Sequence, residues 1–157
     1  MPKWKMTTNA LGLDKDRTAI GNGRDLHVSP KKTREVCRAI RGMTLTNAKK
    51  YLEQVIQLKA PVPFTRYNKL IPHRHGMQVW GTPQGRFPEK SARMVYEVLA
   101  NAESNAEYKG LDTEKLRVIH SCCLKARTTR RYIERAHGRS TPYFKSLSHV
   151  EIVLMEQ

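Results

Sequence analysis

The chain has 157 residues, a length that supports one hydrophobic core without a disulfide or metal staple. Its 29 Lys and Arg residues outnumber 14 Asp and Glu residues, and the formal net charge of +15 favours a polyanionic partner, nucleic acid above all. No run approaches the roughly 18 apolar residues of a membrane span, so a membrane-spanning chain is disfavoured. The three cysteines form neither an even disulfide set nor a CxxC pair, so a disulfide framework is disfavoured as well.

The N-terminal segment, Met1 to Gly23, is polar and shows no sustained hydrophobic period. It has no apolar core of a signal peptide, and we expect a soluble, intracellular chain with free thiols. Gly21-Asn22-Gly23 is predicted to form a turn that leads into a short strand over Arg24–Val28.

The first predicted helix begins with Ser29 as N-cap, has proline at its first helical position, and ends at Gly42. Its apolar stripe is predicted to face the core and consists of Thr33, Val36, Cys37 and Ile40. A basic stripe runs beside it and consists of Lys31, Arg34, Arg38 and Arg41. In an isolated helix such a stripe is a solvated face, but at this net charge a contact with RNA phosphates is equally well supported.

A second helix is predicted from about Thr46 to before Pro61, with Ala48, Leu52, Val55 and Ile56 inward. The next stretch, about residues 59–88, contains five of the eight prolines and no clean period, and is predicted to be a long irregular insertion. It interleaves aromatic rings with arginines, an arrangement suited to stacking on bases and contacting phosphates: Phe64, Arg66, Tyr67, Arg74, Trp80, Arg86 and Phe87. The alternative is that these aromatic side chains pack on their own body.

His73 and His75 in this insertion have no Cys or acid at ligand spacing, so no metal site is predicted there.

The third helix is predicted over about Glu89 to Lys109, with Gly110 as its C-terminal cap. Its apolar stripe is Ala92, Val95, Val98, Leu99, Ala102 and Ala106. Asn101 and Asn105, one turn apart, are candidates to hydrogen-bond a neighbouring strand or RNA.

The C-terminal part, about residues 116–156, is predicted to form an extended two-stranded arm. One face of its first strand is predicted to carry Leu116, Val118, His120, Cys122 and Leu124, and the return strand is His149–Met155 with Val150, Ile152 and Leu154 inward. The stretch between them is too long for a tight turn and too charged for a core. Its cations must face solvent or an anion: Lys125, Arg127, Arg130, Arg131, Arg135, Arg139 and Lys145.

The run Arg135-Ala136-His137-Gly138-Arg139, followed ten residues later by His149-Val150-Glu151-Ile152-Val153, resembles the C-terminal signature of the large-subunit ribosomal protein 22 family, whose eukaryotic members are numbered 17. Three further segments agree in order: Ser29-Pro30-Lys31-Lys32-Thr33-Arg34, Ile40-Arg41-Gly42-Met43, and Asn101 to Glu107 followed by Lys109-Gly110-Leu111-Asp112. The insertion is similar to that of archaeal and eukaryotic members through Val62-Pro63-Phe64, Arg66-Tyr67-Asn68 and Gln84-Gly85-Arg86.

The resemblance implies an α+β fold, in which a small three-stranded antiparallel sheet packs against three helices and a long β-hairpin protrudes. It implies a single ribosomal-protein domain over residues 1–157. The expected function is structural: the body binds rRNA of the large subunit, and the hairpin lines the nascent-peptide exit tunnel. The implied partners are large-subunit rRNA, neighbouring ribosomal proteins and, near the hairpin tip, the nascent peptide. The implied location is the cytoplasm, with assembly in the nucleolus if the source is eukaryotic.

The residues expected to bind RNA lie on the first helix, in the insertion and along the arm: Lys31, Lys32, Arg34, Arg38, Arg66, Arg74, Arg86, Lys125, Arg127, Arg130, Arg131, Tyr132, Arg135, His137, Gly138, Arg139 and Lys145. Gly138 is expected to permit a close backbone approach or a positive φ. Tyr132 and Tyr143 can stack on bases or pack across the hairpin. No catalytic residue, metal or cofactor is predicted.

Two other functions are compatible with the composition. A ribonuclease would need His120, His137 or His149 in a preorganised cleft as general acid and base. A basic RNA- or DNA-binding regulator would work away from the ribosome.

Overall fold

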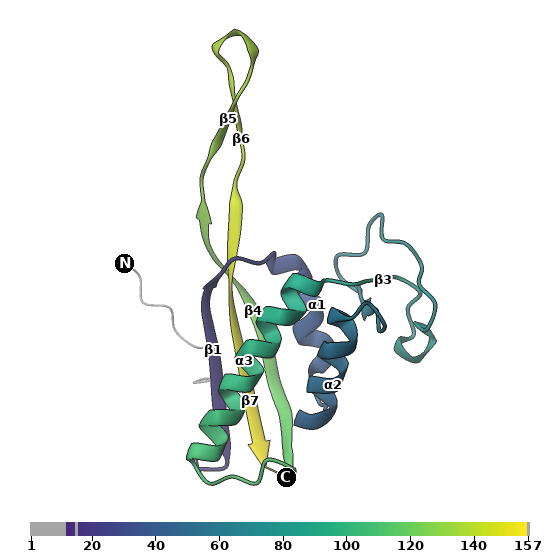
Figure 1. The fold of residues 1–157 in the computed structure, drawn as a ribbon, viewed down its shortest axis with the longest axis vertical. Helices are drawn as coiled ribbons and strands as arrows, with labels where there is room; N and C mark the ends of the chain where they lie inside the picture. Colours follow the sequence, from purple (N-terminus) through teal and green to yellow (C-terminus); the bar gives the residue numbers. More distant parts are fainter. Residues whose placement is uncertain (1–11, 15, 157) are drawn as a thin grey trace.

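Helices cover one face of an antiparallel sheet, and a hairpin extends from that sheet far beyond them (Figure 1). The computed structural model describes residues 12–14 and 16–156, and within them three α-helices pack on a three-stranded sheet. The predicted α+β architecture is therefore confirmed. Of the predicted irregular N-terminal segment, residues 1–11 and 15 lie outside the described residues.

The sheet has the strand order β1-β7-β4, where β1 is Thr18–Leu26, β4 is Leu116–Thr129 and β7 is Lys145–Glu156. Both pairings are antiparallel, so β7, the last strand in the sequence, lies in the middle. The predicted inward set on this strand, Val150, Ile152 and Leu154, is fully buried. A central strand buried in this way accounts for the run of apolar residues at the C-terminal end of the sequence.

The helices are α1 (Pro30–Ile40), α2 (Leu45–Ile56) and α3 (Glu89–Tyr108). α3 packs on β1 and β7, α1 packs on β4, and α2 packs on α3. The predicted stripe of α3 is buried in full, as is that of α1, because both helices lie with their apolar face on the sheet. Asn105 donates a hydrogen bond to the carbonyl oxygen of Ile20 on β1 at 2.8 Å, so the strand is the partner of this asparagine.

The predicted turn at Gly21-Asn22-Gly23 is wrong, because these residues lie inside β1. Gly21 is needed for close packing: a Cβ there would lie 2.5 Å from the Val98 carbonyl oxygen and 2.7 Å from the Ala102 Cβ. The strand ends in an irregular register between Gly23 and Leu26, where Asp25 has a φ of 49°. The glycines therefore mark where a helix approaches a strand backbone.

The predicted alternation along β4 is wrong beyond Val118. Val118 pairs with Leu154 but His120 pairs with Val153, so Ile119 is an extra residue at a bulge. From there on, the opposite set of side chains faces the helices. Cys123 points to α1, where its Sγ lies 3.7 Å from the Pro30 carbonyl oxygen, and His120 and Cys122 lie on the other face.

The insertion is mostly irregular, as predicted, and is held by a short antiparallel pair of β2 (Val62–Pro63) and β3 (Gly85–Arg86) with a 3₁₀ turn, η2 (Gln78–Trp80). Phe64 is buried in the main core, and Trp80 packs on Tyr51 with ring centroids 5.7 Å apart. For these two aromatic residues the alternative of packing on the body is correct.

The hairpin continues the β4–β7 ladder as far as the pair Thr129 and Lys145, so the return strand is longer than the predicted His149–Met155. Beyond that pair come β5 (Tyr132–Glu134) and β6 (Ser140–Pro142), with the 3₁₀ turn η3 (Ala136–Gly138) at the tip. Every residue from 130 to 145 is exposed. The arm therefore has no core of its own, whereas its base is part of the main core.

We expect Gly21→Ala to lower the free energy of unfolding by about 1–3 kcal/mol, because the new methyl group must displace the α3 backbone or bend β1. Chemical denaturation followed by circular dichroism measures this change. The control is His27→Ala, an exposed position just after the strand, with an expected change within about 0.5 kcal/mol. Equal stability of Gly21→Ala and the parent chain would contradict the close-packing role.

Candidate nucleic-acid interface

The shaft, residues 125–145, presents all seven of its predicted cations to solvent. Lys125, Arg127, Arg130, Arg131, Arg135, Arg139 and Lys145 are all exposed. Arg127, at the base of the shaft, has an acidic neighbour: its Nε lies 3.6 Å from Oδ2 of Asp25. Both side chains of that pair are largely exposed, so the contact orients Arg127 with little gain in stability.

The tip of the hairpin is closed by a backbone hydrogen bond from Arg135 N to the Arg139 carbonyl oxygen at 2.9 Å. Gly138 has a φ of 67°, so of the two reasons expected for a glycine here the positive φ is found, and a Cβ there would meet nothing within 4 Å. His137 also has a positive φ, 57°, which the sequence analysis missed. Two successive left-handed residues make the turn tight and place Arg135 and Arg139 next to each other.

The aromatic residues of the shaft pack on each other and still remain open to solvent. Tyr132 meets Phe144 edge to face with centroids 5.8 Å apart, and Lys145 Nζ lies 5.8 Å from the Tyr143 ring centroid. Tyr132 is 62% exposed and Tyr143 is 51% exposed. Packing across the hairpin therefore covers only part of the Tyr132 ring. Tyr132 and Tyr143 both keep accessible surface on which a base can stack.

A second group of cations surrounds a pocket of about 300 Å³ between α1 and β4. Its lining is Arg34, Arg38, Arg41, Ser121, Cys122 and Cys123. Arg38 donates to Thr65 Oγ1 at 2.7 Å and Arg41 donates to the Ser121 carbonyl oxygen at 2.7 Å. Each guanidinium has five N–H donors, so these contacts orient the groups and leave donors for an anion. Arg41, noted in the basic stripe but absent from the expected RNA-binding residues, belongs to this group.

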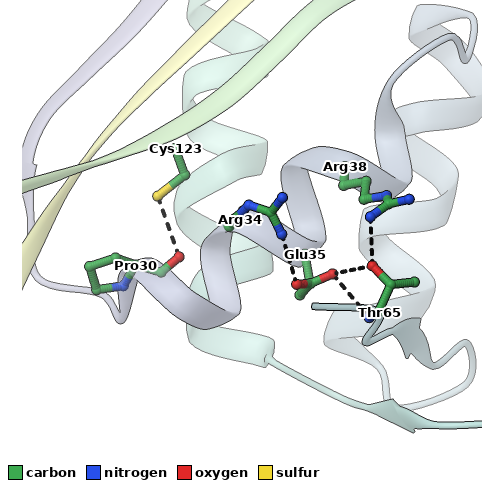
Figure 2. Close-up of polar contacts among 6 residues, drawn as sticks. All are labelled: Pro30, Arg34, Glu35, Arg38, Thr65 and Cys123. Carbon is green, nitrogen blue, oxygen red and sulfur yellow. Dashed lines mark hydrogen bonds and ion pairs between the residues drawn. The ribbon is translucent and has the colours of Figure 1, made fainter. Parts of the chain in front are cut away.

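Glu35 explains how the arginines of α1 are held, as Figure 2 shows. Its side chain is fully buried, accepts from Arg34 at 3.2 Å, and accepts from both the Thr65 backbone N–H at 3.3 Å and its hydroxyl at 3.2 Å. One carboxylate therefore links an arginine of α1 to the start of the insertion. Sequence analysis missed it because Thr65 is distant in sequence, although an acid within a basic stripe is a signal for such a link.

Tyr67 gathers three cations that were predicted separately. Lys31, Arg34 and Arg66 lie 5.5, 6.0 and 5.9 Å from its ring centroid. The ring itself is 36% exposed. The three cations lie over the ring, so the cluster gathers positive charge suited to phosphates, and the exposed part of the ring stays open to a base.

The two cationic surfaces, on α1 and on the shaft, meet at a groove of about 360 Å³. Lys31 near the start of α1 and Lys125 on β4 both line it, together with Phe144 just before β7 and Ser146 of β7. A phosphate backbone can therefore pass from the arginine pocket to the shaft without leaving positive surface.

The remaining predicted cations lie apart from these clusters. Lys32 is exposed on α1. In the insertion, Arg86 donates to the Leu70 carbonyl oxygen at 3.1 Å, and Arg74 stacks over Phe87 at 5.6 Å from the ring centroid. These two arginines therefore also stabilise the insertion itself.

The three histidines considered for a ribonuclease do not converge. His137 lies at the tip, whereas His120 is in the body and His149 accepts a hydrogen bond from the Asp25 backbone at 3.1 Å. Burial lowers the pKa of His120, the charge of Arg41 lowers it further, and Glu151 opposes the shift. A neutral imidazole on a sheet, far along the chain from the tip histidine, does not make an acid–base pair.

All three cysteines are free thiols, as expected. Burial raises the pKa of Cys123 to about 11 and that of Cys37 still further, so both stay protonated at neutral pH.

Within residues 12–14 and 16–156, no helix has both the length and the apolar character needed to cross a bilayer.

Comparisons with known proteins give one consistent family. A family model described as ribosomal protein L22p/L17e matches residues 21–155. The chain is 46% identical to the large ribosomal subunit protein uL22 of Methanopyrus kandleri over 160 residues, covering 100% of both chains. It is 41% identical to that of Ignicoccus hospitalis, covering 99% of both chains, and 49% identical to that of Methanothrix thermoacetophila, covering 89% of this chain and 91% of the relative.

We expect Glu35→Ala to lower the free energy of unfolding by about 1–3 kcal/mol, because the Thr65 backbone N–H loses its acceptor. Limited proteolysis is expected to cut first within residues 59–88, because the link from α1 to the insertion is lost. The matched control is Glu97→Ala on the exposed face of α3, which should change neither property. Unchanged protease resistance of the insertion in Glu35→Ala would contradict the anchoring role.

Proposed function

Because the chain belongs to the ribosomal protein L22p/L17e family, we propose that it is a structural constituent of the large ribosomal subunit that binds rRNA and places its hairpin along the nascent-peptide exit tunnel. The observation that carries this proposal is the shaft, exposed at every residue from 130 to 145 and rich in arginine, on a base whose apolar residues are buried in the core: Leu116, Val118, Val150, Ile152 and Leu154. A protruding arm of this kind needs surrounding polyanion to fix its shape.

The mechanism is scaffolding by charge and shape. Guanidinium groups of the arginine pocket and the shaft bind phosphates where rRNA segments approach one another, and Tyr67 offers a stacking surface between them. These contacts read backbone and shape more than base edges. The narrow tip, which carries Arg135 and Arg139, reaches the tunnel wall and meets the nascent peptide.

The proposed partners are large-subunit rRNA, neighbouring ribosomal proteins and the nascent chain, and the proposed location is the cytoplasmic ribosome. In a eukaryotic cell the assembly step would be nucleolar. We assign no enzymatic activity, and we treat residues 1–157 as a single ribosomal-protein domain whose insertion and hairpin are appendages. The same cations would also serve a basic RNA-binding protein that works off the ribosome.

Sedimentation separates these two functions. In a lysate resolved on a sucrose gradient, the full chain is expected to co-migrate with the large subunit in near-stoichiometric amount, because scattered phosphate contacts hold it only to folded rRNA. Washing the subunits with increasing salt should release the chain gradually, as expected for release of counterions. A chain found mainly in the light fractions would exclude the ribosomal role.

Two variants test how much of the RNA-binding charge lies on the shaft. In the first, residues 130–144 are replaced by an Asn-Gly turn between the paired Thr129 and Lys145, which removes Arg130, Arg131, Arg135 and Arg139. In the second, the same four arginines become glutamine. Both are expected to melt at the parent temperature and to flatten the plot of log K against log salt by on the order of 0.7 per lost phosphate contact, measured with an rRNA fragment.

Lys115→Gln is the charge control, since Asp112 already neutralises this lysine at 2.8 Å, and its slope should match the parent. Unfolding of the truncated chain would contradict the independence of body and arm. A parent-like slope in both variants would contradict RNA binding by the shaft.

A further inference from the structure

Three side chains with metal-ligating atoms meet on the face of the sheet that the helices do not cover. One ligand atom each from His120, Cys122 and Glu151 can be chosen so that all three lie within 4.8 Å of one another. Cys122 and Glu151 are direct partners in the β4–β7 ladder, and His120 is two residues before Cys122 on the same side. The juxtaposition is therefore fixed by backbone pairing.

Two observations indicate that this cluster is suited to hold a cation. The Glu151 side chain is fully buried, and the Cys122 thiol lies 3.6 Å from its Oε2. Within the part of the chain that the structure describes, Nε2 of His120 is buried without a hydrogen-bond partner. A buried ring nitrogen left without a partner is costly, and a coordinated metal ion removes that cost.

We propose that His120, Cys122 and Glu151 form a binding site for Zn²⁺. A nitrogen, a sulfur and a carboxylate oxygen are the ligand types that zinc prefers, and three protein ligands with a water in the fourth position make a tetrahedral site. Ligand atoms around zinc are about 3.3–3.8 Å apart, given bonds of about 2.0–2.3 Å. Cys122 Sγ and Glu151 Oε2, 3.6 Å apart, already lie in this range, so the closing of up to about an ångström that zinc needs falls mainly on His120.

The charge of the filled site balances. On binding, the Cys122 thiol releases its proton to solvent, so the thiolate and the Glu151 carboxylate together neutralise the two positive charges of the ion. Among the described residues, Arg41 is a nearby cation that opposes a metal, and its guanidinium donates to the Ser121 carbonyl oxygen at 2.7 Å. His120 and Cys122 are only half-buried, which leaves the ion a path from solvent.

Ligand spacing along the chain predicts no metal, because the three ligands of this cluster come from two different strands. The alternation predicted His120 and Cys122 on the same face as Leu116 and Val118, and the third ligand comes from the other strand. The bulge at Ile119 moves the first two outward, and the register then brings Glu151 beside them.

Cobalt is the probe for this site, since a thiolate bound to Co²⁺ gives a charge-transfer absorption. The full chain, kept reduced and freed of RNA at high salt, is titrated with Co²⁺ and then with Zn²⁺. We expect one equivalent of cobalt, a thiolate band, and its loss when zinc displaces cobalt. Cys122→Ser should abolish the band, while Glu151→Gln and His120→Asn should weaken cobalt affinity at least about tenfold.

Cys123→Ser is the matched control, because this neighbouring thiol faces the helices and should leave the band unchanged. Circular dichroism establishes that each variant is folded. In the parent chain, a further measurement needs no substitution: Zn²⁺ should slow alkylation of Cys122, read by mass spectrometry, at least about tenfold relative to zinc-free protein. Absence of the band, its persistence in Cys122→Ser, or unprotected alkylation of Cys122 would overturn the proposal.

Discussion

The pairing of β4 with β7 is the constraint on which the rest of the structure depends. One ladder runs from the pair Leu116 and Glu156 in the body to Thr129 and Lys145 in the arm. Its inner end is buried under the helices, where residues such as Ile152 and Leu154 are inaccessible to solvent. Because the same two strands continue outward, the direction of the arm is set by burial in the body. Its outer part is supported by backbone hydrogen bonds, by ring contacts and by the hydrogen bond that Arg135 Nε donates to Thr141 Oγ1 at 3.3 Å.

Acidic residues have a particular place in this cationic chain. Glu35 is buried inside the body, where it orients Arg34 and holds the insertion through Thr65. Asp25 faces Arg127 where the arm leaves the sheet. Both acids position arginines, while the shaft beyond them carries almost uncompensated positive charge. Such a distribution keeps local geometry defined and concentrates the positive charge on the shaft.

Sequence patterns predicted the elements whose signal is local. The stripes of α1 and α3 follow from the 3.6-residue period, and the apolar ends of the hairpin and its charged middle follow from composition. What failed depends on long-range pairing. The Gly21-Asn22-Gly23 segment is typical of a turn, but Gly21 allows close contact with Ala102. The bulge at Ile119 has no sequence signature of its own. The partners of Glu35 and Glu151 lie on segments distant in sequence. The positive φ of Gly138 was foreseen, whereas that of His137 depends on how the tip closes.

The two irregularities in β4 have a joint effect on the arm. One extra residue lies between Val118 and His120, and another between Lys125 and Thr128, both on the same strand. Each reverses which side chains face the helices, so the second restores the phase that the first changed. A single residue inserted or deleted in β4 between Leu116 and Thr128 would therefore turn the β4 side chains of the arm to the opposite side, whereas a change of two residues would preserve the side they face.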